Sequence, residues 1–472
     1  MTAPSELPRL SAVEQARLIR TRQVSPSELL HAHLAVIARL NPQLNAIVTL
    51  VEDQARETAK SIEQRLARGE AVGPLAGLPV VIKDVTLTRG IRTTYGSPHY
   101  RDFVPDEDAE VVARLRRADA IILAKTNTPE FATGANTVNE LFGATRNPWN
   151  PALSPAGSSG GSAVAVASGM APLAQGTDFG CSIRIPAAFC GIVGVRTTPG
   201  LVPNRPMRLP WDAGQVHGPL ARSAEDAALM IDAIKGLDPL WPLSFEPPWT
   251  SALDIVQRSA GPKGLRIAYA SDIAGFGVDA EIDAVCKAAL VRLAGAGAAV
   301  EEIAFDASEG FAAYKVLRGE WMVGQQLERL GMLDRFGPNL QGNVRDGLAL
   351  TVKDTAAAEA VRERLQGRFR ELLTRFDFLL TPAAPVSPFP VEQNFPEEVG
   401  GRKLSNYIDW IAPAFLVTMV GFPAGSVPAG KTASGLPVGM QIVGPRFAEP
   451  QILSLAKAIQ DSHPIGWPPI SA

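Results

Sequence analysis

The stretch AGSSGGSAVAVASGMAPLAQGTDFGCSIRIPAAFCGIVGVR, residues 156–196, contains two clusters of glycine and serine separated by small apolar residues. The first cluster, GSSGGS, spans residues 157–162, and the second, GTDFGCS, spans residues 176–182. Glycine loses much conformational freedom on folding, so this density indicates sharp turns or a backbone that approaches a ligand closely. Serine hydroxyls and free backbone N–H groups on such turns can contact an anion. The stretch therefore predicts a site suited to acyl transfer.

The two clusters resemble the core of the amidase signature hydrolases, in the forms Gly-Ser-Ser-Gly-Gly-Ser and Gly-Thr-Asp-x-Gly-x-Ser-Ile-Arg-Ile-Pro-Ala. The resemblance covers nearly the whole chain, most firmly residues 75–235 and weakly residues 240–400. Matching segments flank the clusters on both sides: LAGLPV (75–80) with Lys83-Asp84, Lys125-Thr126-Asn127, Asn147-Pro148-Trp149, GFPAG (421–425) and GLPVGMQIVG (435–444). Similarity over this length is far more specific than one short motif.

Composition and charge narrow the class of function. The 472 residues carry a net charge of −3 with 20% charged residues, which gives no basic footprint for nucleic acid or an acidic membrane surface. The three cysteines form no C-x-x-C pair, so we expect reduced thiols in a cytoplasmic protein and no zinc site. Residues 1–10 show no pattern of a secretion signal. We expect a monomer or homodimer that acts on a small molecule and needs no metal, cofactor, nucleic acid or membrane.

Helical and strand patterns alternate along the chain. Capping boxes at Ser11 and Ser25 predict helices over 12–21 and 26–40. Short apolar runs predict strands buried on both faces at 80–82 and 121–124, each followed by a lysine. The remaining pattern predicts helices over 51–67, 107–118 and 279–294, a helical stretch over 308–373, and strands over 265–270, 300–305 and 378–380.

This alternation predicts an α/β fold, in which ligands bind near the carboxyl ends of strands. We expect a single large domain with a central, mixed and mostly parallel β-sheet covered by helices on both faces, which is also the fold that the resemblance implies. In chain order the domain is expected to comprise N-terminal helices (1–70), a catalytic core (75–235), a variable substrate-specificity region (240–420) and a C-terminal return to the core (421–460).

Ser182 is the predicted nucleophile because it ends the second cluster, just before a helix predicted near residues 183–189. A helix-capping serine is the structural alternative. The resemblance implies an oxyanion hole built from the backbone N–H groups of Phe179, Gly180, Cys181 and Ser182. Family members often carry Thr or Gly at the position of Phe179 and Gly at the position of Cys181. We therefore expect Phe179 to narrow the acyl pocket and Cys181 to add bulk, while neither removes an N–H group.

A serine nucleophile needs a base. The resemblance implies a lysine that acts through a second serine following a cis peptide bond, and these match Lys83 and Ser158. With its ordinary pKa near 10.4, only about one lysine in 2,500 is neutral at pH 7, and burial can lower that pKa by about 3–5 units. Because Lys83 follows a buried strand, we expect this lowering. The expected supporting residues are Ser159, Thr177, Asp178 and Arg184, with Asp178 and Arg184 forming an ion pair that braces the turn.

Two other motifs offer competing interpretations. GSSGG (157–161) fits the nucleophile elbow of the α/β-hydrolases with Ser159 as nucleophile, but that triad needs an acid and then a histidine. Only His217 and His463 follow, so this interpretation is disfavoured. GSVPAGKT (425–432) fits the P-loop pattern, but the Gly-Leu-Pro that follows it forbids the required helix.

Histidine and cysteine are not expected to carry the chemistry. His31 and His33 lie two residues apart on a predicted helix, so they point in different directions and are expected on the surface. No histidine is expected in the site, and Cys181 is disfavoured as nucleophile because no histidine lies near it in the sequence.

The sequence therefore predicts a cofactor-independent serine hydrolase that cleaves the C–N bond of an amide. Carbamates, urethanes and aryl esters present the same carbonyl and stay open as substrates. An amidotransferase subunit that works with partner chains is the alternative from another class of function. Phe179 favours an apolar or aryl substrate, and so does the absence of a charge cluster from the predicted helix that carries Trp321. The expected pocket residues are Phe179, Trp321, Tyr407 and Trp410 with the loop 200–215, for which core packing is the structural alternative.

Overall fold

The computed structural model describes residues 5–471, and within them the central element is an eleven-stranded β-sheet. Two further sheets have two strands each. From one edge to the other, the central sheet runs β1 (Ile47–Leu50), β3 (Ile121–Thr126), β2 (Pro79–Lys83), β6 (Leu173–Asp178), β8 (Val216–Ala221), β7 (Val193–Arg196), β14 (Ala424–Lys431), β15 (Pro437–Val443), β11 (Phe378–Pro382), β9 (Arg266–Tyr269) and β10 (Ala299–Glu302). The small sheets pair β4 (Val138–Asn139) with β5 (Gly143–Ala144), and β12 (Glu398–Val399) with β13 (Arg402–Lys403).

The sheet is mixed, as predicted, and its parallel pairs form two blocks. Strands β3, β2 and β6 are parallel neighbours, and so are β11, β9 and β10. The six remaining neighbour pairs of the described sheet are antiparallel, so parallel pairing is less extensive than the alternation of strands and helices predicted. The reason lies in the connections: β14 and β15, for example, are joined by a tight turn rather than by a helix.

Helices cover both faces of the sheet. On β2, Val80 and Ile82 join one hydrophobic cluster and Val81 joins another, so alternate residues enter opposite layers. The first layer contains α1 (Ala12–Arg20), α4 (Glu110–Arg117), α7 (Ala224–Ile234), α8 (Ala252–Gln257), α9 (Ala280–Gly295) and α14 (Glu449–Ser462). The opposite layer contains α2 (Pro26–Leu44), α3 (Glu52–Ala67), α5 (Gly160–Ala167), α6 (Arg184–Cys190) and α13 (Ala412–Met419). A single large α/β domain is therefore confirmed.

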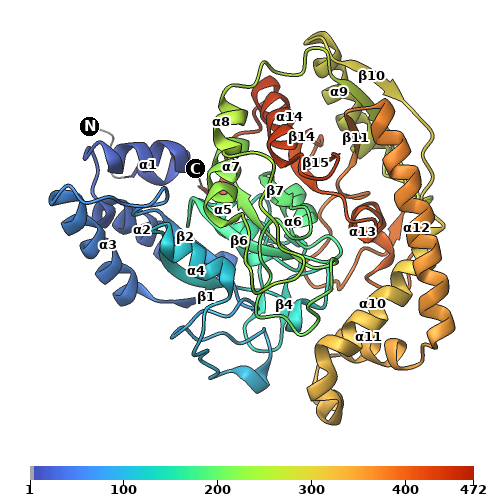
Figure 1. Ribbon diagram of the computed structural model, residues 1–472, viewed down its shortest axis with the longest axis horizontal. Helices are drawn as coiled ribbons and strands as arrows, with labels where there is room; N and C mark the ends of the chain where they lie inside the picture. The colour runs from blue at the N-terminus through green and yellow to red at the C-terminus, as the bar shows by residue number, and fades with distance from the viewer. Residues whose placement is uncertain (1–4, 472) are drawn as a thin grey trace.

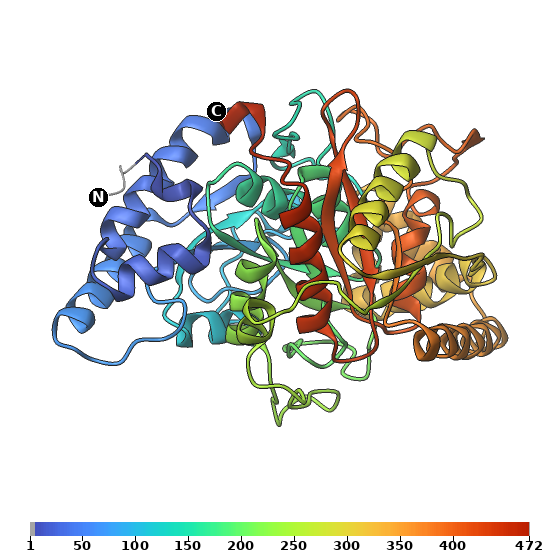
Figure 2. The same ribbon diagram turned by 90° about the horizontal axis from the view of Figure 1, so that it is seen from above.

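The helical stretch predicted over 308–373 is broken into several helices. They are α10 (Gly310–Gln326), a 3-10 segment (Leu327–Arg335), α11 (Pro338–Leu348) and α12 (Val352–Arg375). Pro338 opens α11, and a capping box formed by Thr351 and Asp354 opens α12, so local capping explains both breaks. Figures 1 and 2 place these helices at the end of the molecule opposite the N-terminal helices α1–α3.

Of three expectations about particular segments, two agree with the structure and one is wrong. The capping box at Ser25 is present, and the helix that it starts continues through Pro42 to Leu44. Residues 425–432 lie mainly on β14 rather than in a P-loop, as expected. The surface placement of His33 is wrong: this side chain is fully buried, with Nδ1 2.9 Å from the carbonyl oxygen of Gly169. Helix α2 turns that residue toward the core.

Across residues 5–471, the structure contains no helix whose length and apolar character would let it cross a bilayer.

The first glycine cluster fixes how α5 packs against the sheet. A methyl group added at Gly161 would lie 2.4 Å from the backbone nitrogen of Asn127 and 2.8 Å from the carbonyl oxygen of Ala46. Both neighbours are backbone atoms, which cannot turn away as a side chain would. Glycine therefore allows the start of α5, and the serines before it, to lie directly against the end of β3.

We expect Gly161→Ala to lower the free energy of unfolding by about 3 kcal/mol because of this overlap. Gly367→Ala is the matched control, since Gly367 lies inside α12 with no atom within 4 Å of the added methyl group. That change should stabilise the protein by about 0.5–1 kcal/mol through helix propensity. Urea unfolding measures both, and equal effects of the two substitutions would contradict the packing described.

Candidate active site

The site lies where two parallel strands and two glycine-rich turns meet. Strands β2 and β6 are neighbours and run in the same direction, so their carboxyl ends share one edge of the sheet. Lys83 ends β2, and Thr177 and Asp178 end β6. The turn at Phe179–Ile183 then leads to α6, while Ser158 lies just before α5. The predicted site residues are therefore brought together by the ends of adjacent strands.

Lys83 makes two side-chain contacts in this position. Its Nζ lies 2.6 Å from Oγ of Ser158 and 2.9 Å from Oγ1 of Thr177. The side chain is fully buried, and burial lowers the pKa of Lys83 to about 7, although Asp178 and Cys181 oppose the shift. The lowered pKa of Lys83 agrees in direction with the expectation from the sequence. The peptide bond between Gly157 and Ser158 is cis, as the resemblance implied.

Ser182 shares a small cavity with Ser158 and Thr177, which we call the serine cavity. Its volume is about 30 Å³. Within the described residues, the backbone N–H groups of residues 179–182 donate no hydrogen bond. These N–H groups and the Ser182 side chain therefore lie on one turn beside one cavity, which is the arrangement expected for an oxyanion hole.

The neighbours of Ser182 have distinct environments. Burial raises the pKa of the Cys181 thiol to about 12, so the thiolate that a cysteine nucleophile requires is disfavoured. Ser159 is buried, its Oγ donates to the carbonyl oxygen of Thr177 at 3.3 Å, and its N–H donates to the carbonyl oxygen of Ser182 at 3.1 Å. Ser159 thus links the two turns.

The predicted ion pair of Asp178 and Arg184 is present and fully buried. Arg184 donates from Nη2 to Oδ1 of Asp178 at 2.8 Å and from Nε to Oδ2 at 3.1 Å. Its Nη2 also lies 2.8 Å from the carbonyl oxygen of Gly180, so the pair holds the turn from inside. Burial alone would raise the pKa of Asp178, but the guanidinium groups of Arg184 and Arg196 keep it below its ordinary value. Arg196, which the sequence did not single out, donates to the carbonyl oxygen of Asp178 at 2.7 Å.

One histidine lies closer to the site than the sequence indicated. His217 on β8 pairs with Thr177 across the sheet, and its side chain is buried, with the charge of Lys83 near enough to affect its pKa. Gln175 donates from Nε2 to Nδ1 of His217 at 2.8 Å and accepts at Oε1 from the backbone N–H of Lys83 at 3.2 Å. The pairing register of β6 and β8 brings His217 here, which sequence distance alone could not reveal. Burial, with Lys83, lowers the pKa of His217 to about 4, so the ring is neutral, and it makes no hydrogen bond to Lys83, Ser158 or Ser182 in the described structure.

Three of the four predicted pocket residues line the serine cavity. The Trp321 ring stacks on Phe179 with centroids 4.2 Å apart, and Tyr407, which lies on a bend, lines the same cavity. Trp410 does not reach the cavity, so that prediction is wrong. Its ring is fully buried between Phe189 and Phe389, with centroids 5.9 Å and 5.5 Å away, and it belongs to the hydrophobic core.

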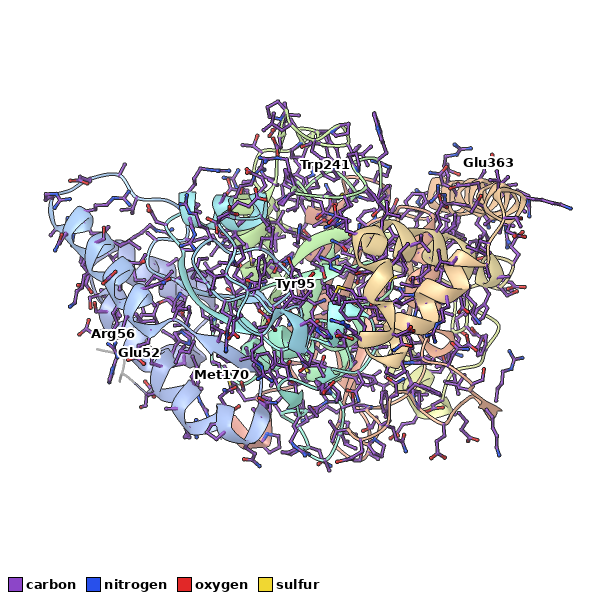
Figure 3. The ribbon with its side chains drawn as sticks, turned by 90° about the horizontal axis from the view of Figure 1, so that it is seen from below. Glu52, Arg56, Tyr95, Met170, Trp241 and Glu363 are labelled. Atoms are coloured by element: carbon purple, nitrogen blue, oxygen red, sulfur yellow. The ribbon has the colours of Figure 1, made fainter. Side chains whose placement is uncertain are left out.

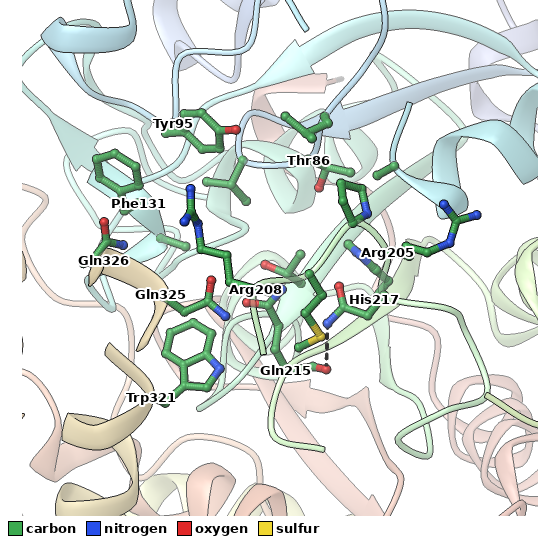
Figure 4. Close-up of a pocket in the computed structure, with 18 of the residues that line it drawn as sticks. Thr86, Tyr95, Phe131, Arg205, Arg208, Gln215, His217, Trp321, Gln325 and Gln326 are labelled. Atoms are coloured by element: carbon green, nitrogen blue, oxygen red, sulfur yellow. Dashed lines mark hydrogen bonds between the residues drawn. The ribbon is translucent and has the colours of Figure 1, made fainter. Parts of the chain in front are cut away.

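Two larger clefts adjoin the serine cavity. The first, which we call the arginine cleft because Arg205, Arg208 and Arg329 line it, has a volume of about 510 Å³, and the buried residues Thr177 and His217 also line it. Figure 4 draws its lining, with Tyr95 and Thr86 on the side opposite Trp321, and Figure 3 shows Tyr95 near the middle of the molecule. The second, the Trp211 cleft, has a volume of about 820 Å³ and is lined by Phe179, Trp211 and Trp321 among others. Trp321 therefore lines the serine cavity, the arginine cleft and the Trp211 cleft.

Metal binding has no evident place in the part of the chain that the structure describes. No group of three or more His, Cys, Asp and Glu side chains is arranged there to hold a metal ion. Independence from metals stays a prediction.

Replacing Lys83 should stabilise the fold while removing the amine. The folded-state pKa of Lys83 lies below that of an unfolded lysine, so the unfolded chain binds more protons between about pH 7 and pH 10 and wild-type stability rises with pH across this window. We expect Lys83→Met to have a higher free energy of unfolding than wild type at pH 7. The difference in free energy of unfolding between the two proteins should be about 2 kcal/mol smaller at pH 9.

Lys125→Met is the companion variant, because burial lowers the pKa of Lys125 less far, to about 8, and its Nζ has three oxygen partners within 2.9 Å, from Thr86, Thr88 and Thr93. Removing the Lys125 amine leaves those three partners unsatisfied and should destabilise the protein, with a smaller change in stability between pH 7 and pH 9 than for Lys83→Met. A pH-independent difference between Lys83→Met and wild type would contradict the lowered pKa.

Comparison with known proteins supports this fold and identifies the family. The family model described as Amidase matches residues 28–453. An acylamidase from Rhodococcus erythropolis is 36% identical over 465 residues, which are 96% of each chain, and a glutamyl-tRNA(Gln) amidotransferase subunit from Moorella thermoacetica is 35% identical over 97% of each chain. A solved bacterial aryl acylamidase of the amidase signature enzymes has a TM-score of 0.90 at 28% identity, covering 97% of this chain and 96% of that one. The chain therefore belongs to the amidase signature family.

Proposed function

We propose that this protein hydrolyses an amide through an acyl-enzyme on Ser182, with Lys83 as the base and Ser158 as the proton carrier. The observation that carries the proposal is the 2.6 Å contact between Nζ of Lys83 and Oγ of Ser158, made by a buried lysine whose pKa is near 7. A lysine in this state is neutral in a large fraction of molecules at neutral pH, and only the neutral amine can accept a proton. The acylamidase relatives support amide hydrolysis as the reaction.

In the acylation step, Oγ of Ser182 forms a bond to the amide carbon while its proton passes to Ser158 and the proton of Ser158 passes to Lys83. The negative charge that develops on the carbonyl oxygen meets the free N–H groups of the turn at residues 179–182. The relay then returns a proton to the amide nitrogen, the C–N bond breaks, and the amine leaves. The acyl group stays on Ser182.

In the deacylation step, water takes the place of the amine. Its proton enters the relay, its oxygen bonds to the acyl carbon, and the bond from that carbon to Oγ of Ser182 breaks. Ser182 recovers a proton, and the acid leaves. Carbamates and aryl esters carry the same carbonyl and can follow the same steps.

An amidotransferase subunit is the second candidate, because the relative from Moorella thermoacetica has that name. Such a subunit would pass ammonia to a partner chain rather than act alone. Turnover of a simple amide by the purified chain therefore separates the two candidates.

We expect the purified chain to release aniline from a simple anilide, and a phosphonyl fluoride to abolish this activity by labelling Ser182. Intact mass followed by peptide mapping locates the adduct. The adduct should persist in Ser159→Ala, where the removed hydroxyl only bridges the two turns, and should be absent from Ser182→Ala. An adduct on Ser159 or Cys181 would contradict the assignment, and labelling without turnover of any amide would favour the amidotransferase candidate.

A further inference from the structure

Arg318 on α10 is a buried cation without an acidic partner. Its side chain is 7% exposed, and within the described residues no carboxylate lies within 4.0 Å of it. It donates from Nε to Oδ1 of Asn343 at 2.7 Å and from Nη2 to the hydroxyl of Tyr407 at 2.8 Å, while Nη1 lies 3.5 Å from the hydroxyl of Tyr314. A guanidinium group has five N–H donors, so these neutral partners leave part of its hydrogen-bonding capacity unused. The rings of Phe179 and Tyr407, with centroids 5.9 Å and 5.7 Å from Cζ of Arg318, interact with its charge, but no negative charge in the described structure lies beside it to compensate it.

Tyr407 adds a second donor at the same place. Its hydroxyl oxygen accepts from Nη2 of Arg318 and from Nδ2 of Asn343, each at 2.8 Å. A phenolic oxygen has two acceptor positions, so both are occupied and its own O–H remains to donate. Arg318 and Tyr407 therefore present only hydrogen-bond donors to any ligand, and such a pair suits an acceptor that carries negative charge.

This donor pair lines the serine cavity together with Ser158 and Ser182. Among the residues that line this cavity in the described structure, none is an Asp or Glu. Aromatic and apolar side chains form much of its remaining wall, and the other polar side chains there, Thr133, Thr177 and Gln215, are neutral, so a charge inside it is poorly screened by water. The sequence favoured an apolar or aryl substrate and did not single out Arg318, the guanidinium group that α10 brings to the site.

The size of the serine cavity indicates which part of a substrate it holds. About 30 Å³ accommodates one or two water molecules, and so a short chemical group. The departing amine needs an open path, which the arginine cleft and the Trp211 cleft provide with their larger volumes. The group that stays on Ser182 belongs in the small cavity, next to Arg318.

We propose that Arg318 and Tyr407 form a carboxylate-binding subsite on the acyl side, and that the preferred substrates are monoamides of short dicarboxylic acids. This inference rests on the proposed function, because it assigns the acyl side by attack from Ser182. The substrate carboxylate replaces the missing acidic partner of Arg318 and accepts the O–H of Tyr407. Arg318 then contacts the substrate and contributes to specificity, in addition to its hydrogen bonds to Tyr407 and Asn343.

The test compares two ligands of nearly equal shape, malonanilate, which ends in a carboxylate, and acetoacetanilide, which ends in a neutral methyl ketone. Isothermal titration calorimetry on Ser182→Ala protein measures binding without turnover. We expect malonanilate to bind about 10-fold or more tightly than acetoacetanilide, as charged hydrogen bonds imply. Arg318→Gln in the same background should remove this preference, and Tyr407→Phe, which deletes only the hydroxyl, should reduce it.

Lys315→Gln is the matched control. It removes a positive charge from the same helix, but Lys315 pairs with Asp409 at 2.8 Å and does not line the cavity, so the preference should persist. Equal affinity for the two anilides, or an unchanged preference in both Arg318→Gln and Tyr407→Phe, would overturn the subsite. Because binding is measured without chemistry, tight malonanilate binding by Ser182→Ala combined with no hydrolysis by wild type would reject the proposed function and keep the subsite.

Discussion

The buried contact between Lys83 and Ser158 is the constraint on which the rest of the site depends. A charged ammonium group is strongly disfavoured away from water, so a lysine at this position loses its proton near pH 7 instead of near pH 10. That requires full burial of the Lys83 side chain at the end of β2, and close packing of backbone on backbone contributes to it. Gly161 allows α5 to approach β3, and Thr177 provides the second oxygen that Nζ of Lys83 contacts.

A second buried group gives the turn beside Ser182 its shape. Asp178 is held by Arg184 and Arg196, and the same Arg184 reaches the carbonyl oxygen of Gly180. Removing one member would leave an unpaired charge in a dry interior, which is strongly destabilising. The network therefore fixes the turn at residues 179–182, with its N–H groups left free for a ligand.

The parts of the site that could be predicted from sequence are those encoded by local motifs. Thr177, Asp178 and Arg184 lie in or beside the second glycine-rich cluster, and the resemblance of the surrounding motifs implied the roles of Lys83 and Ser158. His217, Gln175 and Arg318 were missed because strand register and helix packing bring them in from segments without a motif. Trp410 shows the opposite error, since an aromatic residue near a pocket in sequence can still belong to the core. The extent of antiparallel pairing was missed for a similar reason: it depends on connections rather than on strand patterns.

We propose that neutral Lys83 drives the attack of Ser182, and the rate of phosphonylation of Ser182 as a function of pH measures this role. We expect a rate that rises with pH through a midpoint near 7 in wild type and in His217→Gln, because the pKa of His217 lies near 4. Lys83→Ala and Ser158→Ala should each be slower by several powers of ten without that midpoint, and the double variant should be little slower than either, as for groups that act as a unit. A midpoint near 7 that persists in Lys83→Ala, or that disappears in His217→Gln, would contradict the account.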